Sequence, residues 1–154
     1  ASNRSWAFLV SDDEEPSARL WEFASKVPKL KDNKGRDYLW RCRMIAPLPD
    51  WSAHYKTLDT YQPRYFPRES IRWPGGFDEL PMARLKEINV NYVLWHYTLW
   101  SPRKYREQKA QLHEAAWNAA WDKHSWPFPG YASYFYEDHP EAYASLEEWK
   151  DQRP

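Results

Sequence analysis

The sequence predicts an α/β fold, with a mixed sheet flanked by helices and with long loops rich in proline and aromatic residues. Three observations predict it. The apolar run WAFLV at residues 6–10 is typical of a strand covered on both faces. Residues 38–46 alternate in the manner of an antiparallel or edge strand. A long run of helix-forming residues follows Ser101 and Pro102, which suit the N-cap and the first helical position.

The other elements are expected at the following places. Pro16 and Ser17 open a helix whose apolar residues recur at helical spacing until Pro28 stops it. Residues 47–91 contain six prolines and two adjacent glycines, which favours loops laid over a scaffold, because proline cannot donate to a sheet ladder. Further elements are a short strand at 63–67, a strand at 91–97 and a last short helix at 139–150. We expect residues 1–154 to be one domain or part of one.

The composition excludes some classes of partner. The 22 Lys and Arg balance the 22 Asp and Glu, so no bulk attraction to nucleic acid or anionic lipid is expected. The longest apolar runs are far shorter than the roughly 20 residues of a transmembrane helix. Cys42 is the one cysteine, so no internal disulfide can form and a reducing, cytoplasmic location is expected. The 11 Trp and 11 Tyr suit sugar-stacking surfaces, but an ordinary core is the better explanation for most individual rings.

Four consecutive carboxylates, residues 12–15, directly follow the first predicted strand. A strand that ends in adjacent acids delivers them to the rim of a sheet, where α/β proteins bind ligands. Hard divalent cations such as Mg²⁺ and Mn²⁺ prefer these oxygens and use few protein ligands, which leaves room for phosphate oxygens. The alternative is a solvated turn whose acids favour the positive N-terminus of the next helix.

The stretch WAFLVSDDEEPSARLWEFASKV resembles the acidic-motif segment of family-two nucleotide-sugar glycosyltransferases, which have the GT-A fold. In that family the acids bind the metal that bridges the diphosphate of the sugar donor. Asp13 and Glu14 match the second Asp and the Glu of the motif, whereas Ser11 stands at its first Asp, with Asp12 beside it. The resemblance therefore implies a Mn²⁺ or Mg²⁺ site that uses Asp13, with Asp12 or Glu14 in support.

Two later segments extend the resemblance in the same order along the chain. YQPRYFPRESIRWPGGFDEL, residues 61–80, is similar to the family segment that carries the general base and contacts the substrate. It implies that Asp78 or Glu79 takes the proton of the acceptor hydroxyl and that Arg72 and Trp73 bind substrate, with Trp73 stacking on a sugar face. The alternatives are an exposed acidic pair in a loop and a tryptophan that covers the core.

The third segment, VLWHYTLWSPRKYREQKAQL, resembles the late strand and basic helix of the family. His96 matches a histidine that completes metal or diphosphate coordination, although a lone histidine on an apolar strand is more often a hydrogen-bonded core residue. Arg103 and Lys104 lie in the first helical turn, where an anion such as a diphosphate would offset the unfavourable helix dipole. A solvated basic face is the simpler alternative.

The family's first half, which grips the nucleoside, has no counterpart before Ala1. The resemblance therefore implies the C-terminal half of a GT-A-like domain, with a separate chain or a missing segment covering the sheet. Its substrates would be a nucleotide-sugar donor and a glycan or other hydroxyl acceptor. Two rival functions are a non-catalytic carbohydrate-binding or assembly protein on the same scaffold, which Ser11 favours, and a metal-dependent hydrolase, which lacks an evident second ligand set.

Overall fold

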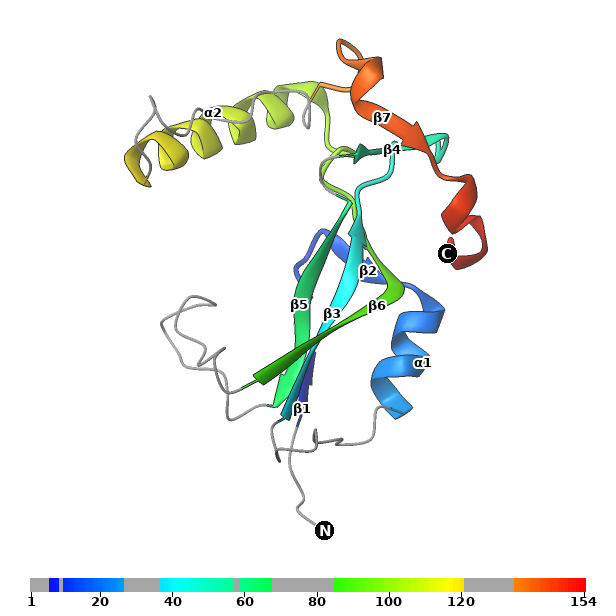
Figure 1. The fold of residues 1–154 in the computed structure, drawn as a ribbon. Coiled ribbons are helices and arrows are strands. Elements are labelled where there is room, and N and C mark those ends of the chain that lie inside the picture. The colour runs from blue at the N-terminus through cyan, green and yellow to red at the C-terminus, as the bar shows by residue number, and fades with distance from the viewer. Residues whose placement is uncertain (1–5, 9, 27–36, 57–58, 68–84, 121–134) are drawn as a thin grey trace. The chain divides into compact units, whose positions relative to one another are not determined.

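Strands and helices are interspersed along the chain, so the predicted mixed α/β class is confirmed (Figure 1). The computed structural model describes residues 6–8, 10–26, 37–56, 59–67, 85–120 and 135–154. Contacts within the chain define two compact units. The first contains residues 1–44, 60–95 and 151–154, and the second contains residues 45–59 and 96–150.

A five-stranded sheet forms the body of the first unit (Figure 1). Its strand order is β1-β5-β3-β6-β2, and β5 pairs antiparallel with both β1 and β3. The strands are β1 (Trp6–Phe8), β2 (Glu14–Pro16), β3 (Asp37–Ile45), β5 (Thr60–Pro67) and β6 (Leu85–His96). The boundary between the units falls inside β3 and before the last residue of β6, so His96 still belongs to a strand of this sheet.

The pairing of β3 with β5 contains a register shift. Trp40 lies opposite Tyr65, whereas the next residue, Arg41, lies opposite Pro63. Arg64 is therefore the extra residue of a β-bulge on β5. Bulges locally bend a strand and redirect the side chain of the inserted residue. Pro63 suits such a place because it has no N–H to contribute to the ladder.

Helix α1 (Ala18–Lys26) packs on the sheet of the first unit. Ser17 caps it, because the Ser17 Oγ accepts the Leu20 N–H at 3.1 Å and so satisfies one of the free donors of the first turn. The same hydroxyl donates to Gln152 Oε1 at 3.1 Å, which ties the helix start to the C-terminal segment. Leu20 is buried with Cys42 and Leu94 between helix and sheet.

The second unit contains a two-stranded antiparallel sheet, β4 (Ala53–Tyr55) with β7 (Tyr143–Ser145), and the long helix α2 (Arg103–Ala120). Two 3₁₀ helices flank β7, at Pro140–Ala142 and Glu147–Gln152. Its core is small and aromatic: Ala46, Tyr55 and Leu99 are buried, with Tyr136 and Tyr143 packed against them.

Several predicted boundaries were wrong. Pro16 ends β2 rather than opening the helix, which begins at Ala18. Residues 47–91 hold more strand than expected, since β4, an eight-residue β5 and the start of β6 all lie there. The expected helix at 139–150 is replaced by 3₁₀ turns around β7. Part of the predicted strand at 6–10, residue 9, lies outside the described residues, as does Pro28.

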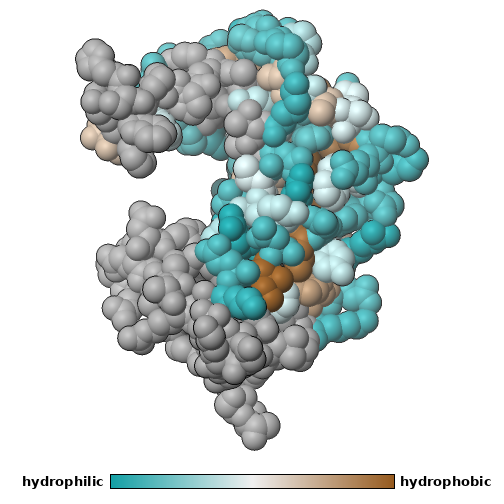
Figure 2. Space-filling view, in the orientation of Figure 1, coloured by the Kyte–Doolittle hydropathy of each residue, from teal (hydrophilic) through white to brown (hydrophobic). Residues whose placement is uncertain are grey.

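Among the described residues, no helix combines the length and the apolar character that crossing a bilayer requires. Figure 2 shows that the described part of the visible face is mostly hydrophilic, with apolar residues in small patches. Large apolar side chains that are exposed in the described chain include Val10, Trp21, Trp100, Tyr105 and Leu112.

Candidate metal site

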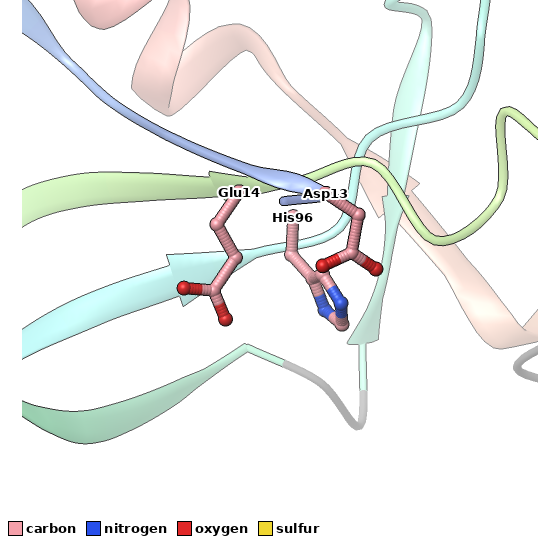
Figure 3. A group of neighbouring side chains, drawn as sticks. All are labelled: Asp13, Glu14 and His96. Carbon is pink, nitrogen blue, oxygen red and sulfur yellow. The ribbon is translucent and has the colours of Figure 1, made fainter. Parts of the chain in front are cut away.

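Asp13, Glu14 and His96 form a group of possible metal ligands at the end of the five-stranded sheet. Each offers one ligand atom, and these atoms all lie within 4.8 Å of one another. The neighbouring strands β2 and β6 bring them together, since Asp13 directly precedes β2, Glu14 begins it and His96 ends β6. Figure 3 shows the three side chains extending in the same direction from the ends of these strands.

This spacing is close to that of a bound cation. Two ligands at 2.0–2.2 Å from one ion lie at most about 4.4 Å apart, so small side-chain rotations would complete the site. Two carboxylates and an imidazole suit Mn²⁺ or Zn²⁺, and the carboxylates alone suit Mg²⁺. The donor set therefore fits a divalent cation with coordination positions left for oxygens of a ligand.

The carboxylate of Glu14 is nearly inaccessible to solvent and is paired with an arginine. Its side chain is 3% exposed and accepts from Arg64 Nη2 at 2.9 Å through Oε1 and from Arg64 Nε at 3.4 Å through Oε2. The Ser11 backbone N–H donates to the same Oε2 at 3.1 Å. Burial of a carboxylate is costly unless it is paired, and Arg64 supplies the compensating charge.

Asp12 lies in the turn before β2 and is exposed, outside the group of three. The expectation that Asp12 supports the metal together with Asp13 is therefore not matched by this geometry, whereas Glu14, its alternative in that role, does lie in the group. Sequence reasoning missed Arg64 altogether. Arg64 lies in the segment PRYFP, which was expected to be a strand. No local pattern in the sequence shows that this arginine contacts an acid 50 residues earlier.

Cys42 is a further side chain near Glu14 and Arg64, and it does not act as a metal ligand. Its side chain is buried, and that burial raises the pKa of the thiol to about 12, with the positive charge of Arg64 opposing and the negative charge of Glu14 adding to the effect. Because only the thiolate binds metals and acts as a nucleophile, Cys42 stays a neutral core residue at ordinary pH.

Arg103 and Lys104, the predicted diphosphate contacts, lie in the second unit at the start of α2. Arg103 already has acidic partners, since its Nη2 lies 2.7 Å from Asp138 Oδ2 and its Nε 3.3 Å from Glu107 Oε1. The hydrogen bond that the Arg103 guanidinium donates to Asp138 raises the pKa of this guanidinium. Lys104 is exposed. The unfavourable position of the Arg103 charge at the helix N-terminus is thus offset by carboxylates of the protein itself.

Arg106, one turn further along α2, makes the more buried pair of this helix. The residue is 3% exposed and its guanidinium donates to both oxygens of Glu137, at 3.0 and 2.5 Å, and to the Ser101 carbonyl at 2.9 Å. It also lies over the Tyr136 ring, 4.6 Å from the ring centroid. These contacts tie the start of α2 to the segment before β7.

The predicted catalytic and substrate-binding residues Asp78, Glu79, Arg72 and Trp73 lie outside the described residues. Two of the three stretches that the resemblance brings to one site, around Asp13 and around His96, do meet at one end of the sheet.

Comparison of the chain with protein-family models, with curated proteins and with solved structures finds no match.

Proposed function

We propose that this chain is the acceptor-side part of a metal-dependent glycosyltransferase with a GT-A-like fold, which acts with inversion. One observation supports the proposal more than any other. The family resemblance, taken from the sequence alone, requires an acid after the first strand and a histidine at the end of a late strand to share one cation. Asp13 and His96 have ligand atoms within 4.8 Å of each other.

In this proposal Asp13 and His96 would hold Mn²⁺ or Mg²⁺, and the bound cation would supply positive charge that stabilises the diphosphate leaving group. Asp78 or Glu79 accepts the proton of the acceptor hydroxyl while its oxygen bonds to the anomeric carbon. The bond from that carbon to the diphosphate oxygen breaks, and the diphosphate leaves with the electron pair. Trp73 stacks on the sugar, and Arg72, Arg103 and Lys104 contact the substrates.

The proposal also includes a partner and a cellular location. The nucleoside-binding half of the family's domain would belong to a longer protein or to a second chain that covers the sheet. The single cysteine suits the cytoplasm. The rival, a carbohydrate-binding or assembly protein without catalysis, is favoured by two features of the acidic run. Ser11 stands where the family has its first acid, and Glu14 is engaged by Arg64.

Isothermal titration with Mn²⁺, with and without UDP, tests the proposal on this chain and on any longer parent protein. We expect Asp13→Asn to weaken Mn²⁺ binding by about tenfold or more, because a ligand carboxylate loses its charge. Asp12→Asn is the matched control, since the neighbouring acid lies outside the group of three and its replacement should change the affinity by less than about twofold. An intact parent protein that gives no metal-dependent heat would count against the enzyme and favour the binding protein.

A further inference from the structure

Arg64 is held beside the candidate metal site by the local shape of β5. It is the extra residue of the β-bulge that separates the pair Trp40–Tyr65 from the pair Arg41–Pro63. Bulges are common beside functional sites, where they re-aim a side chain that regular pleating would direct elsewhere. The strands β5 and β2 are not neighbours in the sheet, so the contact of Arg64 with Glu14 is a side-chain contact outside the sheet ladder.

The contact removes Glu14 from the ordinary chemistry of a ligand. Both carboxylate oxygens accept hydrogen bonds from the guanidinium, and one also accepts the Ser11 N–H. The side chains of Arg64 and Glu14 are 15% and 3% exposed, so water screens this pair weakly. A cation that bound Glu14 would have to displace a guanidinium or share the carboxylate with it, and the two positive charges would repel each other.

We propose that Arg64 is a positioning residue that keeps Glu14 out of the metal's coordination sphere. Of the described residues, only Asp13 and His96 then serve as ligands, and the remaining positions are left for anionic oxygens such as those of a diphosphate. The positive charge of Arg64 also lowers the affinity of the site for the bare cation. An anionic ligand offsets this repulsion, so the metal binds more favourably together with such a ligand than alone. This inference rests on the proposed function, because it concerns the same cation site.

Four variants of the 154-residue chain test it, with free Mn²⁺ measured by electron paramagnetic resonance. Glu14→Gln should weaken Mn²⁺ binding clearly less than Asp13→Asn does, because it removes a nearby negative charge but no ligand. Arg64→Met should tighten Mn²⁺ binding by about tenfold, because it removes a nearby positive charge and releases a carboxylate. Arg64→Lys, which keeps the charge, should stay close to the unmodified chain. The double variant Arg64→Met/Glu14→Gln removes both charges together, so its Mn²⁺ affinity should also be close to that of the unmodified chain.

A merely structural arginine would not raise metal affinity when replaced, so tightening in Arg64→Met is the decisive result. The inference is overturned if Glu14→Gln weakens Mn²⁺ binding as much as Asp13→Asn does, or if Arg64→Met leaves the affinity unchanged or lower. Circular dichroism reports folding. Arg64→Met leaves a buried carboxylate unpaired and could therefore fail to fold. In that case the Mn²⁺ affinities of Glu14→Gln and of the neutral double variant test the inference.

The outcomes separate this inference from the proposed function. Mn²⁺ binding that depends on Asp13 and His96 but not on Arg64 overturns the inference alone. Binding that is seen only in Arg64→Met supports the inference and counts against the proposed enzyme in its natural sequence. Absence of Mn²⁺ binding in every variant overturns both.

Discussion

The ion pair of Arg106 with Glu137 should stabilise the second unit at neutral pH and lose this effect in acid. The hydrogen bond from the Arg106 guanidinium lowers the pKa of the Glu137 carboxyl from 4.5 to about 2. A carboxyl whose pKa is lowered on folding stabilises the folded state above its unfolded pKa, and this contribution is lost as the pH falls through the folded value. The loss should therefore occur between about pH 4.5 and pH 2.

The size of this contribution follows from the same values. A pKa lowered from 4.5 to about 2 corresponds to about 3 kcal/mol, at about 1.4 kcal/mol for each pH unit. The Glu137 side chain is 35% exposed, however, so solvent screening reduces the contribution to about 1–2 kcal/mol. Glu137→Gln should lower the free energy of unfolding by about this amount at pH 7 and by much less near pH 2.

Urea unfolding, followed by tryptophan fluorescence at pH 7, 4 and 2.5, measures this difference between Glu137→Gln and the unmodified chain. Glu147→Gln is the matched control, because Glu147 pairs with Lys150 at the surface with a side chain that is 72% exposed. It should cost less than about 0.5 kcal/mol at every pH. A Glu137→Gln deficit that is the same at pH 7 and pH 2.5 would refute the reasoning, because the charge of Glu137 would then not be its cause.

Three further substitutions test local features of the fold. Ser17→Ala removes the cap of α1 and a buried hydrogen bond to Gln152 and should cost about 1–2 kcal/mol in urea unfolding, whereas exposed Ser25→Ala should cost less than about 0.5. Trp51 has a φ of 60°, so Trp51→Gly should be less destabilising than Trp51→Ala by about 1 kcal/mol, and an equal loss would contradict a strained backbone. The buried Cys42 thiol, whose pKa is about 12, should react with a disulfide reagent only in urea, and rapid labelling of the folded chain would contradict its burial.

The sequence predicted those elements whose pattern is local. The strand expected at 38–46 is found as Asp37–Ile45, and the helix expected after Ser101 begins at Arg103. Alternation and helical spacing carry this information within a few residues, whatever the rest of the chain does. The meeting of Asp13 with His96 was expected from the family resemblance, although Asp13 directly precedes β2 instead of ending the first strand.

The elements that were missed depend on pairing between distant segments. β4 has three residues, too few for a periodic pattern, and it exists because β7 pairs with it from the other end of the chain. The strand β5 contains Pro63, which argues locally against a long strand, and the bulge beside it makes proline acceptable there. Arg64 was missed for the same reason, since the bulge that directs it is a property of the β3–β5 register.

The four acids of residues 12–15 look equivalent in the sequence, and the pleat of β2 makes them different. Successive strand residues point to opposite faces, so Glu14 and Glu15 cannot both join one site. Glu15 is exposed, as is Asp12 in the preceding turn, whereas Glu14 turns inward to Arg64 and Asp13 lies beside His96. The Arg64 guanidinium offsets the negative charge of Glu14, whose carboxylate lies within 4.8 Å of that of Asp13. Asp13 lies beside His96 at the end of the neighbouring strand β6, which is why the metal proposal depends on this residue.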